Sequence, residues 1–138
     1  MTNNKITIKV TVSADSKKVW DYYTSPKHNT KWNFAIDTWH CPTASNDLKK
    51  GGRYVARMEA KDGSFGFDFE AVYDEINENK KISYTMTDGR QAVIDFISGD
   101  NQTEIIITFD AEQQNSIEMQ RDGWQAILNN FKEYTETN

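Results

Sequence analysis

The sequence predicts an α+β fold in which a curved antiparallel sheet is wrapped on one long C-terminal helix. Short segments with the two-residue alternation of β-strands recur from residue 35 to about residue 110, separated by turn residues. The hydrophobic period then changes to that of an amphipathic helix. Two short helical segments follow the first strand, so we expect the order strand, two helices, several strands and long helix.

Length and charge limit the class of protein. A chain of 138 residues fits one domain, 1–138, because single hydrophobic cores commonly support about 100–150 residues. The formal charge is −5 and the lysines are scattered in pairs, so we expect no nucleic-acid partner. No apolar run approaches the ~20 residues that span a bilayer, so we expect no membrane insertion.

Cysteine content and the first residues favour the cytoplasm. The single cysteine, Cys41, has no partner for an internal disulfide, and the N-terminal residues contain no apolar stretch typical of a secretion signal. We therefore expect a reducing, cytoplasmic environment. The sequence leaves open whether the protein is a monomer or a homodimer.

The first thirty residues predict a strand and two short helices. Residues 6–12 alternate between apolar and polar side chains, as expected of a strand with one buried face. The run Ser13-Ala14-Asp15 supplies capping chemistry for a helix that ends near Thr24, because Pro26 cannot continue it. A second helical turn is expected at residues 27–31.

The middle of the chain predicts an antiparallel meander of about six or seven strands, counting the first. Turn signals such as Gly51-Gly52, Asp62-Gly63 and Asp88-Gly89 separate the β segments. Alternation places aromatic and methionine side chains on the inner face of the sheet. The expected strands lie near residues 35–41, 53–60, 65–76, 81–87, 91–98 and 103–110.

The last segment predicts a helix of about 19 residues, which spans ~28 Å. Six or seven strands spaced ~4.8 Å apart cover a similar distance, so this helix can cross the whole concave face. Gly123 interrupts the helix, either because the helix backbone approaches the sheet or a ligand closely or because a glycine is tolerated there. The apolar stripe consists of Ile117, Trp124, Ile127, Leu128 and Phe131.

A series of short motifs along these elements resembles a known superfamily. The motifs are Ser13-Ala14-Asp15, Val19-Trp20-Asp21, Ser25-Pro26, Trp32, Gly51-Gly52, Asp62-Gly63 and Gly123-Trp124. Together they extend over nearly the whole chain and resemble the START/Bet v 1-like (SRPBCC) helix-grip superfamily. Within it, the chain is most similar to the AHSA1-type domain, named after the activator of the Hsp90 ATPase. The resemblance implies a cavity between helix and sheet that holds an apolar or amphipathic small molecule.

The aromatic inner face and this resemblance predict binding of a small hydrophobic or amphipathic ligand. Pockets for such ligands are mostly apolar with a few polar groups, and Tyr54, Tyr84 and Trp124 combine large apolar surfaces with polar tips. Ordinary core packing explains the same aromatic set. The predicted ligand-binding residues are Trp32, Phe34, Trp39, Tyr54, Met58, Phe67, Phe69, Tyr84, Met86, Phe96, Trp124, Ile127, Leu128 and Phe131.

The sequence contains no recognisable catalytic constellation. His28 and His40 have no Cys, Asp or Glu at a familiar metal-binding spacing. Cys41, next to His40, points to the opposite face of its expected strand, and no Gly-x-Ser-x-Gly motif occurs. We therefore assign no catalytic residue, metal site or cofactor, and expect binding without catalysis.

Two other functions stay open. Resemblance to the Hsp90-activator domain implies a chaperone-linked protein-binding module, with a protein partner in place of a small ligand. Resemblance to the cyclases of the superfamily implies a cyclase-like or hydrolytic enzyme that acts on a cyclic or aromatic substrate. In that case a buried tyrosine such as Tyr54 or Tyr84 would orient a carbonyl group.

Overall fold

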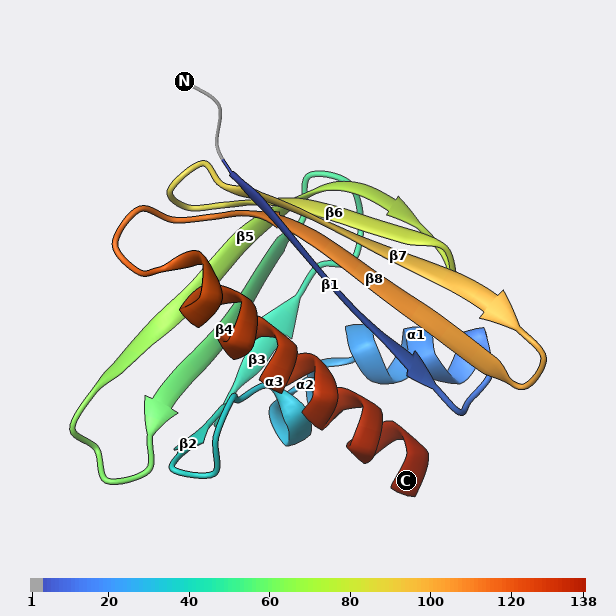
Figure 1. The fold of residues 1–138 in the computed structure, drawn as a ribbon, viewed down its shortest axis with the longest axis horizontal. Helices are drawn as coiled ribbons and strands as arrows, with labels where there is room; N and C mark the ends of the chain where they lie inside the picture. Colours follow the sequence, from blue (N-terminus) through green and yellow to red (C-terminus); the bar gives the residue numbers. More distant parts are fainter. Residues whose placement is uncertain (1–3) are drawn as a thin grey trace.

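The computed structural model describes residues 4–138, which form one antiparallel sheet with three helices (Figure 1). The strands are β1 (Lys5–Val12), β2 (Trp39–His40), β3 (Ala44–Asn46), β4 (Arg53–Ala60), β5 (Gly66–Asn77), β6 (Lys81–Met86), β7 (Gln91–Gly99) and β8 (Gln102–Asp110). The helices are α1 (Ser16–Thr24), α2 (Pro26–Trp32) and α3 (Ile117–Thr137). This architecture confirms the expected α+β fold, with a long C-terminal helix and two short helices after the first strand.

The sheet is an antiparallel meander to which the first strand adds at the β8 edge. Its order is β1-β8-β7-β6-β5-β4-β2, and β3 also pairs with β4. β1 pairs antiparallel with β8, which places Ile8 opposite Ile107. The turns fall where the sequence predicted them, and their residues accept the left-handed backbone: Gly63 has φ 77° and Gly89 has φ 92°. The meander therefore follows from local turn chemistry.

The strand expected at residues 35–41 is wrong in its extent. The structure forms only Trp39–His40 there and adds a second short strand, β3. Pro42 lies between the two strands and has no backbone N–H to donate to a sheet. β2 therefore pairs with the end of β4, Trp39 opposite Ala60, and β3 pairs nearer its start, Ala44 opposite Ala56.

Side-chain caps at α1 and α3, and a proline at α2, mark where the helices begin. The carboxylate of Asp15 accepts a hydrogen bond from the backbone N–H of Lys18 at 2.9 Å, as the capping run predicted. Pro26 stands at the start of α2, where its missing N–H costs no hydrogen bond. At α3, the Ser116 hydroxyl accepts from the N–H of Met119 at 3.1 Å. Each start is thus encoded locally.

Helix α3 crosses in front of the sheet in Figure 1, with its C-terminal half beside α1 and α2. Leu128, Phe131 and Thr135 are its buried residues toward the C-terminus. A β-carbon added at Gly123 would meet no atom within 4 Å, so of the two explanations left open by the sequence, close approach of the helix backbone to the sheet does not hold. The glycine is tolerated in open space. Within residues 4–138, no helix is both long and apolar enough to cross a membrane.

Candidate functional site

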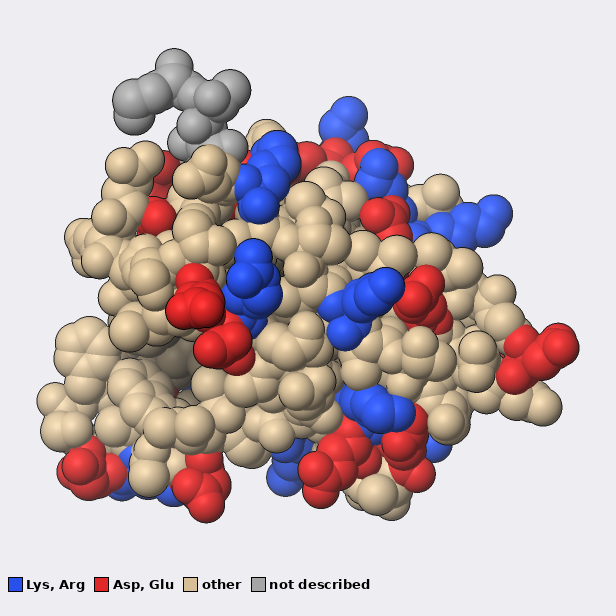
Figure 2. Space-filling model, viewed as in Figure 1, with Lys and Arg blue, Asp and Glu red and all other residues tan. Residues whose placement is uncertain are grey.

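A cavity of ≈ 340 Å³ lies between the inner face of the sheet and the three helices. Figure 2 shows a hollow in the surface on the side where β4, β5 and the start of α3 lie in Figure 1. Protein interiors contain few voids larger than one water molecule, and an engineered cavity of about 150 Å³ already binds benzene. The lining residues are Tyr23, Thr24, Asn29, Trp32, Asn33, Asn46, Tyr54, Met58, Phe67, Phe69, Tyr73, Ile82, Tyr84, Arg90, Ile107, Glu112, Asn115, Gln120, Trp124, Ile127 and Leu128.

Aromatic rings form one wall of the cavity. Phe69 packs edge-to-face on Tyr84 and on Trp124, with ring centroids 6.0 and 6.5 Å apart. Trp124 in turn stacks on the fully buried Phe109, with centroids 3.9 Å apart and planes 11° from parallel. The indole is therefore held between the packed core and the cavity, which gives a bound ring a fixed surface to contact.

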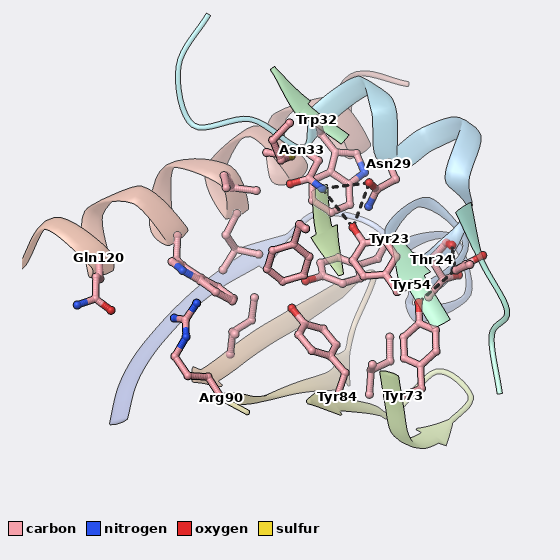
Figure 3. Close-up of a pocket in the computed structure, with 18 of the residues that line it drawn as sticks. Tyr23, Thr24, Asn29, Trp32, Asn33, Tyr54, Tyr73, Tyr84, Arg90 and Gln120 are labelled. Atoms are coloured by element: carbon pink, nitrogen blue, oxygen red, sulfur yellow. Dashed lines mark hydrogen bonds between the residues drawn. The ribbon is translucent and has the colours of Figure 1, made fainter. Parts of the chain in front are cut away.

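A network of amides and a phenol forms the polar part of the wall, where α2 faces β4 (Figure 3). The Tyr54 hydroxyl donates to Asn29 Oδ1 at 3.1 Å, and Asn33 Nδ2 donates to the same oxygen at 3.1 Å. Asn33 Nδ2 also donates to the Tyr54 hydroxyl at 3.2 Å. Asn29 and Asn33 are buried, so these bonds offset the cost of removing two amides from water.

A second polar contact fixes the far end of the same wall. Asn46 Nδ2 donates to the Thr24 carbonyl at 2.7 Å and to the Tyr73 hydroxyl at 3.2 Å. In Figure 3 Thr24 and Tyr73 lie at the end of the cavity opposite Arg90 and Gln120. The Asn46 amide thus ties α1 to β5 at this end of the cavity.

Two tyrosine hydroxyls reach the cavity without a hydrogen-bond partner among residues 4–138. Tyr84 is 6% exposed, and within residues 4–138 neither its hydroxyl nor that of Tyr23 forms a hydrogen bond with the protein. Burial raises the pKa of Tyr23, and burial with the neighbouring tyrosines raises that of Tyr84, so both phenols stay neutral at pH 7. Each hydroxyl can donate a hydrogen bond to a group placed in the cavity.

Charged side chains occur where the cavity meets the β6–β7 turn and the loop before α3. Arg90 Nε donates to Asp88 Oδ2 at 2.7 Å. Glu112 accepts hydrogen bonds from the backbone N–H groups of Gln114 and Asn115 at 3.1 and 2.6 Å. Its second oxygen accepts from Asn115 Nδ2 at 3.0 Å. Glu112 therefore fixes the loop that leads into α3.

The structure brings a subset of the predicted ligand-binding residues together around the cavity. Lining residues come from α2, β4, β5, β6 and α3, as expected of an enclosed space between helix and sheet. Their ligand-binding role remains a prediction. The predicted residues that line the cavity are Trp32, Tyr54, Met58, Phe67, Phe69, Tyr84, Trp124, Ile127 and Leu128.

The other predicted residues lie outside the lining for different reasons. Phe96 and Phe131 pack edge-to-face on Tyr23, with centroids 5.6 and 5.2 Å away, and fill the core behind it. Met86 is buried in the same core. Trp39 packs outside, against Phe65 and Phe67. Phe34 lies in the loop after α2, where its carbonyl accepts from Asn130 Nδ2.

Sequence reasoning missed the polar part of the lining. Tyr73 and Ile82 follow the inward alternation of their strands, so the pattern alone could have added them. Asn29 and Asn33 are spaced as neighbours on one helix face, but amides on a short polar helix carry no signal of burial. Arg90 follows an Asp-Gly turn, and nothing in its context distinguishes it from a surface arginine.

The cysteine and both histidines lie outside the lining of the cavity. Cys41 is 2% exposed, and burial raises the pKa of its thiol to about 11, so it is protonated at pH 7. His40 pairs with Glu59 at the surface, with 3.7 Å between Nε2 and Oε1. His28 stacks on Tyr22 with ring centroids 4.0 Å apart, and its Nδ1 lies 2.7 Å from the Tyr134 hydroxyl.

Helix α3 over a curved antiparallel sheet, with a cavity between them, defines a helix-grip domain. The family model described as activator of Hsp90 ATPase homolog 1-like protein matches residues 13–136. This match covers most of the chain, which therefore belongs to the AHSA1 family. The resemblance read from the sequence motifs is thereby confirmed.

Solved structures agree with this assignment. The AHSA1-like protein from Aeromonas hydrophila is 37% identical, with a TM-score of 0.91 over 97% of this chain and 93% of that one. Chr148 from Cytophaga hutchinsonii is 51% identical, with a TM-score of 0.84 and the same coverage of both chains. CV1439 from Chromobacterium violaceum, at 20% identity and TM-score 0.87 over 98% of this chain and 99% of that one, shares the fold. No curated protein matches the chain.

Proposed function

We propose that the protein binds a small hydrophobic or amphipathic molecule in the cavity between the sheet and α3. The observation that carries the proposal is the volume of ≈ 340 Å³ in the interior of a chain this small. Ligand pockets commonly measure about 300–1,000 Å³ and combine apolar walls with a few polar groups. The wall of Phe69, Tyr84 and Trp124 has this character, with the Asn29 amide network beside it.

Native mass spectrometry of protein purified from its own source, followed by denaturing extraction, tests the proposal. A reproducible small-molecule mass is expected with the wild type and is expected to be lost in Trp124→Ala, which removes a wall of the cavity. Trp39→Ala is the matched control, because Trp39 lies outside the lining and the same residue type is removed. Thermal unfolding of both variants separates lost binding from lost folding.

A titration with the neutral probe N-phenyl-1-naphthylamine covers the case in which the natural ligand leaves during purification. The fluorescence of this probe rises in an apolar site, so an increase is expected with wild type and Trp39→Ala and a smaller one with Trp124→Ala. A protein that carries no mass and gives no fluorescence increase contradicts the proposal.

Binding to a protein partner is a second candidate, because apolar side chains gather at the surface near β2. Ile36 is 57% exposed and Phe65 is 61% exposed, and Phe65 packs against Trp39. The family description names the activator of the Hsp90 ATPase, so an Hsp90-type ATPase is the partner to test. Stimulation of its ATP hydrolysis by the wild type, and less by Phe65→Ser, would support this candidate; an unchanged hydrolysis rate would contradict it.

A further inference from the structure

Arg90 brings a positive charge to the wall of a mainly aromatic cavity. It follows the turn between β6 and β7, where Gly89 has φ 92° and the Arg90 N–H donates to Asp88 Oδ1 at 3.1 Å. The Arg90 side chain is 23% exposed and lines the cavity. In Figure 3 it projects from the strand side toward the interior, at the same end as Gln120. The turn thus directs the guanidinium inward.

The hydrogen bonds of Arg90 leave one edge of its guanidinium available. Nε donates to Asp88 at 2.7 Å, and Nη1 makes a long contact of 3.4 Å with the Asp110 carbonyl. Nη2 forms no hydrogen bond with any atom of residues 4–138. Asp88 is 55% exposed, so it holds the solvent side of the group. The end formed by Nη1 and Nη2 can bind a planar oxyanion with two parallel hydrogen bonds.

The other polar groups near this end differ from Arg90 because they already form hydrogen bonds with the loop before α3. Gln120 Nε2 donates to the carbonyls of Glu112 and Asn115 at 3.1 and 2.9 Å, and its Oε1 accepts from the Glu112 N–H at 2.8 Å. The Glu112 carboxylate accepts from the loop, which partly compensates its negative charge. Arg90 is therefore the cationic group of the described lining, and its Nη1–Nη2 edge is available to donate hydrogen bonds to a ligand.

The charge of Arg90 acts on the interior of the cavity. Burial and the neighbouring tyrosines raise the pKa of Tyr84, and the positive charge of Arg90 opposes that rise. The electrostatic effect of Arg90 therefore reaches Tyr84, and both residues line the cavity. The Tyr84 hydroxyl has no hydrogen-bond partner within residues 4–138, so a donor from β6 and a donor from the β6–β7 turn both face the cavity.

We propose that the cavity selects an aromatic or cyclic carboxylate, whose carboxylate group binds the Nη1–Nη2 edge of Arg90. The apolar ring lies against Phe69, Tyr84 and Trp124, and the Tyr84 hydroxyl donates to the same acid or to an oxygen on its ring. This inference rests on the proposed ligand binding and adds the chemical class of the ligand. Arg90 is the residue that determines the preference for an anion.

Calorimetric titration at pH 7 with 2-naphthoate and 2-naphthamide tests the assignment. The two probes have nearly the same shape, and the first is an anion because carboxylic acids ionise near pH 4. We expect the wild type to bind the carboxylate about tenfold more tightly, since charge-assisted hydrogen bonds are strong and this arginine is partly exposed. In Arg90→Gln the ratio is expected to fall to about one, while the amide binds as before.

Two further variants make the result specific. Arg53→Gln removes the same charge from an arginine that pairs with Glu70 outside the cavity, so the tenfold ratio is expected to persist. Arg90→Lys keeps the charge and loses the planar edge, so an intermediate ratio is expected; it also serves if Arg90→Gln does not fold. Amide chemical-shift spectra of each variant check folding.

The outcomes separate the two proposals. Equal binding of both probes by the wild type, or an unchanged ratio in Arg90→Gln, overturns the anion assignment and leaves cavity binding intact. Binding of neither probe, by calorimetry and by chemical-shift titration, overturns ligand binding together with the anion assignment. A preference for the carboxylate that disappears only when Arg90 is changed supports both.

Discussion

Along β7 and β8 the inner-face side chains of Ile94, Ile105 and Phe109 are fully buried, whereas along β5 Phe67 is 44% exposed and Phe69 is half-buried. Both regions have the same two-residue alternation of apolar and polar side chains. They differ in what covers them, because α1 packs on β7 and β8 while the cavity lies against β4, β5 and β6. An inward-facing apolar pattern thus predicts a covered face and does not predict whether side chains fill the covered space.

The largest expected difference between the two regions is in the stability of matched phenylalanine variants. Phe109→Ala should lower the free energy of unfolding by about 3–5 kcal/mol, because it removes a fully buried ring from a packed core. Phe67→Ala should cost about 1 kcal/mol, because the ring is nearly half exposed already. Urea denaturation measures both, and equal losses would show that the β5 region is as tightly packed as β8.

A smaller difference in stability is expected between variants of two tyrosines of the cavity wall. Tyr54→Phe should lower the free energy of unfolding by about 1–2 kcal/mol, because Asn29 and Asn33 lose a hydrogen-bond partner in a buried position. Tyr84→Phe should change it by less than about 0.5 kcal/mol, because its hydroxyl has no hydrogen bond to residues 4–138 to lose. A large cost for Tyr84→Phe would point to an internal partner of that hydroxyl.

The helix that bounds both regions offers a stabilising change. Gly123→Ala should raise the free energy of unfolding by about 0.5–1 kcal/mol, because alanine favours the helix and its β-carbon meets no atom within 4 Å. Gly89→Ala is the control with opposite sign, since φ 92° at that turn strains any residue with a β-carbon. Thermal melts compare the two, and destabilisation by Gly123→Ala would restore the idea of a close approach.

The smallest expected effect is a pH dependence from His28, outside the cavity. Burial lowers the pKa of His28, although the nearby Asp21 opposes this. The unfolded chain therefore binds a proton more readily than the native one, and the contribution to stability is present above about pH 6.5 and is lost as the pH falls below it. His28→Gln should flatten the difference in urea midpoint between pH 7 and pH 5; an unchanged pH dependence would rule out this role.

Local chemistry made much of the fold predictable. Asp15 begins α1, Pro26 begins α2, and Gly89 closes the β6–β7 turn, each through a backbone preference that neighbouring residues express on their own. The strand near residue 40 was the exception, because Pro42 divides it and only pairing with β4 decides where each piece runs. Short strands depend on distant partners and are weakly encoded locally.

The sequence by itself determined the helix-grip architecture, since alternation, turn residues and helix caps act over a few residues and agree with one another. It also determined that aromatic side chains such as Phe69 and Trp124 face inward. Only the tertiary structure decided that Phe131 fills the core while Trp124 lines a cavity, and that Asn29 and Arg90 join the lining. The physical reason is that periodicity assigns a side chain to a face, whereas filled or open space depends on how helices pack over the sheet from far along the chain.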